Sequence, residues 1–186
     1  MNKREMILQA AVRLLVDNGI HATPMSMIAK EAQTGMGTIY NYFESKEILI
    51  NEIYRTIKHK EKVVLEASFH TELPVKLQFE QFYRSMVMFF VENTLYFRFL
   101  EQLQTSPIIT DESEKEGYEA VECVMQLLER GKREYIIKDI DTDKLLQFIG
   151  GAIFSYLRWL NKSGNTVTLE KTMETQLRLV WDGIRA

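Results

Sequence analysis

The chain has 186 residues, of which 46% are hydrophobic, and a formal net charge of −3. This length allows a sizeable core, in one domain or in a small domain joined to a larger one. With only three prolines and nine glycines in a composition rich in helix formers, we expect an all-α protein. The negative net charge argues against a protein that coats nucleic acids without regard to sequence.

The charge is distributed unevenly along the chain. Residues 1–62 contain nine Lys or Arg against seven Asp or Glu, a net charge of +2, and the remainder has a net charge of −5. The basic excess therefore lies in the N-terminal part. Such an asymmetry suits a local DNA footprint, although an excess of this size is weak evidence on its own.

The cellular compartment is indicated by one cysteine and by the absence of long apolar runs. A single cysteine, Cys123, excludes an intramolecular disulfide and suits a reducing compartment. The first apolar run is interrupted by Gln9 and Arg13, which argues against a signal peptide. The longest wholly apolar run, residues 86–91, is far too short to span a bilayer. We expect a cytoplasmic protein without a membrane partner.

The N-terminal region predicts three short helices. Apolar residues recur at helical spacing over residues 3–18, and Gly19 is suited to end this helix with a left-handed backbone. Residues 23–46 then read as two helices joined by a tight turn, a helix-turn-helix. Thr23 is the expected N-cap of the first, which begins at Pro24. One face of that helix carries the apolar residues Met25, Ile28, Ala29 and Ala32.

The second of these helices, from about Met36 to Phe43 with Gly35 as its cap, has an unusual surface. Ile39 and Phe43 can anchor it inward, whereas its other side chains suit DNA. Hydroxyls bind phosphate oxygens, asparagine can bond adenine edges, and methionine can touch a thymine methyl group. The alternative is that its tyrosines complete a small core. The outward-facing residues are Met36, Gly37, Thr38, Tyr40, Asn41 and Tyr42.

Residues 7–50 resemble the N-terminal domain of TetR-family repressors. The segments that carry the resemblance are Ile-Ala-Lys-Glu-Ala, Gly-Thr-Ile-Tyr-Asn-Tyr-Phe and Ser-Lys-Glu-Ile-Leu-Ile. The resemblance implies an all-helical homodimer in which the N-terminal domain binds double-stranded operator DNA. It implies that the C-terminal domain binds a small inducer and the C-terminal domain of the second subunit. By position, it implies phosphate contacts for Thr38, Tyr40, Tyr42 and Lys46, and places Met36 and Asn41 nearest the bases. The expected DNA-binding set also includes Thr23 and Ser26.

The chain departs from the family pattern at two positions in the turn. The family usually has glycine where this chain has Gln33, at a position that often needs a left-handed backbone. It also usually has serine where Gly35 stands, so one probable phosphate contact is missing. The segment from Gly37 to Lys46 matches intact.

The rest of the chain predicts further helices, nine in all. Ser45 can cap a fourth helix, reaching about residue 70, which joins a DNA-binding domain of residues 1–47 to a regulatory and dimerisation domain of residues 48–186. The later helices are expected from Pro74 to Val91, from Leu95 to Gln104, from about residue 110 to Tyr135, from Asp141 or Thr142 to Gly164, and from Thr168 to Ile184.

The last two helices are the predicted dimer interface, because both have more apolar surface than packing on their own domain would use. Gly150 and Gly151 would permit close approach of another helix. The alternative is that both helices lie in one large monomer core. The expected interface residues are Phe148, Ile149, Ala152, Ile153, Tyr156, Leu160, Met173, Leu177 and Trp181.

An inducer cavity for an apolar or aromatic molecule is expected where aromatic residues and methionines concentrate, although core packing is the commoner explanation of such stripes. Its expected lining is Phe82, Met86, Phe89, Phe90, Phe99, Leu103, Met125 and Tyr156.

An enzyme is not indicated. The sequence has no glycine-rich phosphate loop, and His21, His59 and His70 lie apart from any partner at metal-ligand spacing. We therefore expect no catalytic residues, metal or cofactor. The function that the sequence favours is a ligand-responsive transcriptional repressor. The alternative is a helical protein-interaction module without DNA binding, which the intact segment from Gly37 to Lys46 disfavours.

Overall fold

A computed structural model describes residues 2–104, 106–163 and 169–186. Ten α-helices and no β-strand occur among these residues, so the expected all-α class is confirmed. The helices form two compact units, which we call unit 1 (Met1–Lys60 and Asn93–Glu119) and unit 2 (Glu61–Glu92 and Ala120–Ala186). The expected ends of the last two helices at Gly164 and Thr168 lie outside the described residues.

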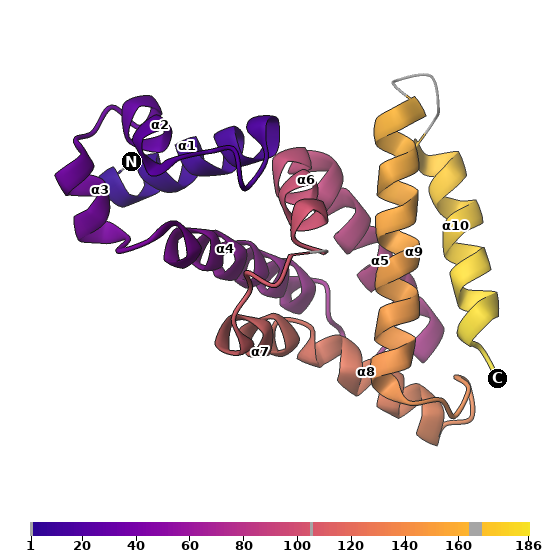
Figure 1. The fold of residues 1–186 in the computed structure, drawn as a ribbon. Coiled ribbons are helices and arrows are strands. Elements are labelled where there is room, and N and C mark those ends of the chain that lie inside the picture. Colours follow the sequence, from indigo (N-terminus) through magenta and orange to yellow (C-terminus); the bar gives the residue numbers. More distant parts are fainter. Residues whose placement is uncertain (1, 105, 164–168) are drawn as a thin grey trace. The chain divides into compact units, whose positions relative to one another are not determined.

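Unit 1 is built around the three N-terminal helices. α1 packs against α2 and α6, and α2 packs against α3 (Figure 1). Asn2 starts α1 with a capping box, in which its side chain and that of Glu5 exchange bonds with each other's backbone amides. The helices of unit 1 are α1 (Lys3–Asn18), α2 (Met25–Glu31), α3 (Met36–Tyr42), α6 (Thr94–Leu103), α7 (Asp111–Glu119), and α4 (Lys46–Ala67) as far as Lys60.

The loop between α1 and α2 differs from the expectation at Thr23. Gly19 has a φ of +91°, as expected for the residue that ends α1. Thr23, however, is fully buried and does not cap α2, whose N-cap is Pro24 without a side-chain bond. Its hydroxyl donates to the carbonyls of Leu14 at 3.2 Å and Gly19 at 2.9 Å. The expected capping role is therefore wrong, because the hydroxyl turns back to the end of α1, where the carbonyl of Gly19 lies beyond the last helical residue and has no helical donor.

The turn between α2 and α3 is a Schellman motif. The amide of Gln33 donates to the carbonyl of Lys30 at 3.1 Å, and the amide of Thr34 donates to that of Ala29 at 2.9 Å. In this motif the residue after the C-cap is left-handed and is usually glycine. Gln33 has a φ of +49°, so the backbone keeps the motif without a glycine.

The connection between α6 and α7 is fastened to α4 by a buried amide. Asn51 Nδ2 donates to the carbonyls of Glu47 and Ile108, both at 2.9 Å, and Asn51 Oδ1 accepts from the amide of Thr110 at 3.0 Å. The Thr110 hydroxyl is a further partner of Oδ1, so the side-chain amide is fully satisfied. A Cβ atom at Gly117 would lie 2.4 Å from the hydroxyl of Tyr54, which shows how closely α7 approaches α4.

The single helix expected from about residue 110 to Tyr135 is two helices, α7 and α8 (Glu122–Arg133). Its buried residues Ser113, Gly117, Ala120 and Val124 recur at helical spacing across the break, so the buried positions continue in phase. The break coincides with the boundary between the two units, because α7 belongs to unit 1 and α8 to unit 2. Tertiary packing therefore decides this break.

Unit 2 is centred on α5, which packs against α8, α9 and α10. Figure 1 shows α9 and α10 side by side. The end of the chain is fastened by two backbone bonds, from the amide of Lys138 to Ile184 O at 2.9 Å and from the amide of Ala186 to Ile136 O at 3.0 Å. Besides the end of α4, the helices of unit 2 are α5 (Val75–Glu92), α8, α9 (Thr142–Ser163) and α10 (Leu169–Ile184).

Replacing Gln33 with glycine should raise the free energy of unfolding by about 0.5–1 kcal/mol. A left-handed backbone costs a residue with a Cβ roughly 1–2 kcal/mol, and the extra chain entropy of glycine offsets about half of that gain. Urea unfolding followed by circular dichroism measures the difference. The control is Gln33→Ala, which keeps the Cβ and should change stability little because the side chain is exposed. Equal stabilities of the glycine and alanine variants would contradict the explanation.

Candidate DNA-binding surface

The helix α3, which is expected to contact DNA, has a buried side and an exposed side. Ile39 and Phe43 are almost completely buried and anchor the helix, as expected. Met36, Tyr40 and Tyr42 are 40–46% exposed, so the two tyrosines do not complete a core. Gly37 and Asn41 are also exposed, and Thr38 is half-buried. The structure thus brings these six predicted residues together on one helix of which most side chains remain accessible.

The position of α3 is fixed at its C-terminal end by Phe43. The guanidinium carbon of Arg4, from α1, lies 5.6 Å from the centre of the Phe43 ring, within the range of a cation–π interaction. Arg4 also forms an ion pair with Glu52 of α4, and Glu52 accepts a further bond from Arg55 at 2.7 Å. Arg4 of α1 therefore contacts the ring that anchors α3 and links it to Glu52 of α4.

Lys46 stands at the start of α4 and its ammonium group faces the loop between α1 and α2. Nζ lies 2.9 Å from the carbonyl oxygen of Ile20, 3.3 Å from that of Thr23 and 3.5 Å from that of His21. An ammonium group has three hydrogens to donate, and three carbonyls surround this one. In this structure the side chain is committed to the loop, whereas the family resemblance implied a phosphate contact.

Ser26 of α2 and Thr23 of the loop that precedes α2 were also expected to contact the DNA. Ser26 is exposed and remains available. Thr23 has no exposed surface, and its hydroxyl is already bonded to two carbonyls of the same domain. We therefore remove Thr23 from the candidate set, since a phosphate oxygen could not reach it without opening the loop.

The expected dimer interface must be corrected, because most of its residues lie in the core of unit 2. Their neighbours on α5, α9 and α10 cover them, so a second chain could not contact them. Phe148 is exposed, while Ala152 and Leu160 are half-buried. The six that are buried are Ile149, Ile153, Tyr156, Met173, Leu177 and Trp181.

An exposed stripe on α9 shares only Phe148 with the expected interface. Phe148, Gly151, Ser155 and Trp159 follow one another at intervals of three or four residues, and Phe148 and Trp159 are 49% and 44% exposed. Leu179, on α10, is 58% exposed. A Cβ atom at Gly150 or Gly151 would meet nothing within 4 Å, so no described part of the chain makes a close approach there. Sequence reasoning included Phe148 but otherwise chose mostly residues on the buried side of each helix.

The expected inducer-lining residues are divided between the two units. Phe99 and Leu103 are buried in unit 1. In unit 2, Phe89 and Phe90 pack ring on ring with centres 5.1 Å apart, and Phe90 continues to Phe154 at 5.7 Å. The remaining members, all in unit 2, are Phe82, Met86 and Tyr156, which are buried, and Met125, which is half-buried.

The interior of unit 2 also holds polar groups that sequence reasoning missed. Neither polar atom of the Gln78 side chain, nor the hydroxyl of Tyr83, has a hydrogen-bond partner among the described residues. Both residues are buried. Burial, and to a lesser extent the nearby Tyr156, raises the pKa of Tyr83 to about 12, so its phenol keeps a proton to donate. An aromatic interior with free polar groups is the kind of lining that small-molecule sites use.

The described residues offer little for metal chemistry or for a reactive thiol. No three His, Cys, Asp or Glu side chains among them come together in an arrangement that could hold a metal ion. Cys123 is half-buried, and burial raises the pKa of its thiol, which disfavours the reactive thiolate. None of the described helices is both long enough and apolar enough to cross a membrane.

Comparison with known proteins assigns both parts of the chain. The profile of the bacterial regulatory proteins of the tetR family matches residues 7–53. The profile of the tetracyclin repressor-like C-terminal domain matches residues 54–186. The boundary between the two profiles lies within α4.

One relative and two solved structures illustrate the similarity. The HTH-type transcriptional regulator YhgD of Bacillus subtilis is 32% identical over 141 residues, which are 76% of this chain and 69% of that protein. A tetR family transcription regulator from Shewanella sp. PV-4 has a similar fold, with a TM-score of 0.92 at 20% identity over the whole of both chains. The regulator FadR of Bacillus subtilis, solved in complex with stearoyl-CoA, gives a TM-score of 0.77 at 21% identity over 97% of this chain and 98% of that one. Because the two profiles together span the chain from residue 7 to its last residue, the chain belongs to the TetR family of transcriptional regulators.

Proposed function

We propose that the chain is a homodimeric repressor that binds operator DNA through α3 and is released by an apolar ligand bound in its C-terminal domain. The observation that carries this proposal is the exposed side of α3, where Met36, Tyr40 and Tyr42 remain 40–46% exposed. The alternative, a helical interaction module without DNA binding, leaves this surface unexplained. The functional division that we propose is residues 1–47 for DNA binding and residues 48–186 for regulation and dimerisation.

We assign the exposed residues of α3 to different parts of the duplex by their chemistry. Asn41 can bond the edge of an adenine, and Met36 can touch a thymine methyl group. The hydroxyls of Thr38, Tyr40 and Tyr42, together with Ser26 of α2, suit phosphate oxygens. Lys46 acts in the proposal by fixing the loop between α1 and α2.

A helix as short as α3 reads few base pairs, so a dimer on a two-fold related operator is the natural arrangement. The exposed stripe of Phe148 and Trp159 on α9, with Leu179 on α10, supports the position of the interface. Gly151 lies within this stripe and has free space around it, which suits a close helix approach from a second copy.

The ligand is proposed to enter the aromatic interior of unit 2. The buried rings of Phe89 and Phe90 favour an apolar body, and the unpartnered groups of Gln78 and Tyr83 could bind a polar end. Stearoyl-CoA, the ligand in the FadR structure, is the first compound to test. A cytoplasmic location and the absence of enzymatic activity belong to the same proposal, since binding to operator DNA and to a ligand requires no catalysis.

Replacing Lys46 with methionine should weaken binding to all DNA sequences alike, without changing the salt slope by more than about half a unit. The reason is that the ammonium holds loop carbonyls, whereas loss of a phosphate contact would reduce the slope by about one. Fluorescence anisotropy on a selected operator and on random DNA, each over a series of salt concentrations, measures both quantities. The companion variant Asn41→Ala should instead change the sequence preference. A slope lowered by a full unit in Lys46→Met would show that this side chain leaves the loop for a phosphate.

Changing Phe148 to glutamate should weaken dimerisation at least about tenfold, because a charge would be buried against the partner. Sedimentation velocity over a concentration series measures the dissociation constant. Leu77→Glu is the matched control, since Leu77 of α5 is 48% exposed and lies outside the stripe, while Phe148 is 49% exposed. Dimerisation that survives the change at Phe148, or is lost equally in both variants, would place the interface elsewhere.

If stearoyl-CoA is the ligand and lowers operator affinity about a hundredfold, the coupling free energy is about 2.7 kcal/mol. Reciprocity then requires operator DNA to weaken stearoyl-CoA binding by the same factor. Calorimetric titration with and without operator compares the two affinities. Binding of stearoyl-CoA with equal affinity in both titrations would exclude it as the inducer.

A further inference from the structure

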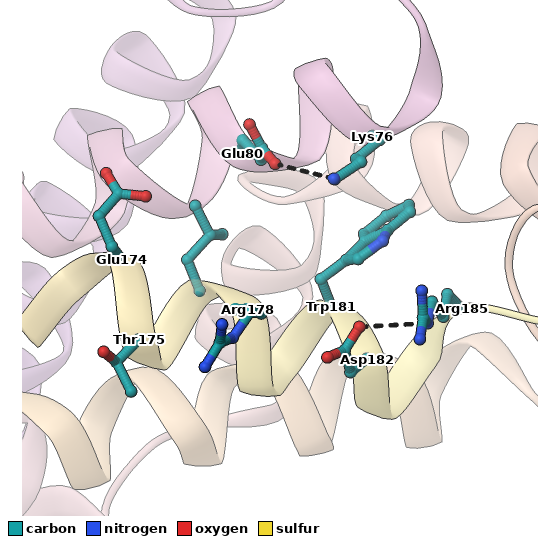
Figure 2. A pocket seen from close by; sticks show the side chains of 9 residues that line it. Lys76, Glu80, Glu174, Thr175, Arg178, Trp181, Asp182 and Arg185 are labelled. Atoms are coloured by element: carbon teal, nitrogen blue, oxygen red, sulfur yellow. Dashed lines mark ion pairs between the residues drawn. The ribbon is translucent and has the colours of Figure 1, made fainter.

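Unit 2 has a surface hollow of about 580 Å³ that the proposed function does not use. We call it the α5–α10 groove after the two helices that line it. Lys76 and Glu80 line it from α5, and Glu174, Arg178, Trp181 and Arg185 are among the residues that line it from α10. Figure 2 shows these side chains around the hollow. Its volume lies within the range of about 300–1,000 Å³ that is typical of small-molecule sites.

The carboxylates of the groove are all neutralised by neighbouring cations. Glu80 forms an ion pair with Lys76 at 3.8 Å, and Asp182 forms one with Arg185 at 3.1 Å, as the dashed lines in Figure 2 mark. Glu174 forms an ion pair with Arg84, which reaches it from α5 outside the groove lining. Each of these three carboxylates therefore already has a cationic partner, which disfavours binding of a cationic ligand.

Arg178 is the exception among the cations that line the groove. It forms no ion pair with any carboxylate in the part of the chain that the structure describes, and it is exposed at the rim. Because the other charged side chains of the groove are in ion pairs, the guanidinium group of Arg178 is the one charge there without an opposite partner among the described residues. A guanidinium binds a carboxylate through two parallel hydrogen bonds, which gives both affinity and orientation.

The floor of the groove is apolar and firmly supported. Trp181 and Leu177 line it and are only 7% and 3% exposed. Behind Trp181 the ring of Phe79 lies 5.4 Å away, centre to centre, and Phe79 packs in turn on Phe82 at 5.9 Å. The indole is therefore held in place by an aromatic cluster and presents a fixed surface to the hollow.

We infer that the α5–α10 groove binds a small amphiphilic carboxylate. Its carboxylate pairs with Arg178, and its apolar body lies on Trp181 and Leu177. The lining of the groove shares no residue with the aromatic interior that we assigned to the inducer, and the proposal does not depend on the repressor function. Binding requires both parts of the ligand, because Arg178 is exposed to solvent and a lone ion pair in that setting is weak.

The test uses octanoate as the probe and Trp181 as the reporter. The background variant Trp159→Phe removes the other tryptophan, so that the fluorescence of the full-length protein reports on Trp181 alone. Because Trp159 lies in the stripe assigned to the dimer interface, sedimentation velocity first verifies that the background variant associates as the unmodified protein does. Titration with octanoate should change this fluorescence saturably. Octanol, which has the same chain length without the charge, and inorganic phosphate, which has charge without an apolar body, should each bind at least about tenfold more weakly.

Arg178→Met in the same background should weaken octanoate binding about tenfold or more. Arg133→Met is the matched control, because Arg133 is an exposed arginine of α8 outside the groove, and it should bind octanoate as the background variant does. Far-ultraviolet circular dichroism verifies that both variants are folded. The proposal is overturned if octanoate gives no saturable change, if octanol or phosphate binds as tightly as octanoate, or if the two arginine variants bind octanoate equally.

Discussion

The carbonyl groups of the loop between α1 and α2 impose the constraint on which the DNA-binding domain depends. Backbone carbonyls at a helix end have no helical donors, and leaving them unpaired in a buried position is costly. Thr23 supplies its hydroxyl to the last turn of α1, and Lys46 supplies its ammonium to the loop itself. Because Lys46 belongs to α4, these bonds join the two helices that flank the helix-turn-helix. The bonds that join these helices are thus made by residues outside the exposed face of α3.

This arrangement explains how a helix of only seven residues can hold an exposed outer side in a fixed position. α3 would not be stable alone, since isolated helices of this length are marginal in water. Ile39 and Phe43 bury its inner side, and Arg4 holds the Phe43 ring from α1. The Schellman turn at Gln33 sets the direction in which α3 leaves α2, at the cost of a left-handed backbone in a residue with a side chain.

In unit 2, by contrast, α9 and α10 have more apolar surface than the core of the unit covers. α9 directs Ile149 and Ile153 into the core and leaves Phe148 and Trp159 at the surface. On α10, Trp181 closes the core and at the same time forms the floor of the α5–α10 groove. Surfaces for a second copy and for small molecules can thus be built from the same helices, because each helix has several faces with different neighbours.

The sequence alone determined the fold class, nearly all helix positions and the outward residues of α3, because helical spacing, caps and turn residues are local signals. It did not show that Thr23 and Lys46 bond the loop, since their partners are backbone carbonyls brought near only by folding. It also did not separate buried Ile153 from exposed Trp159, because both are apolar and only the neighbouring helices decide which side is covered. The break between α7 and α8 was missed for a related reason: the buried positions keep helical spacing across it, and it falls where the chain passes from unit 1 to unit 2.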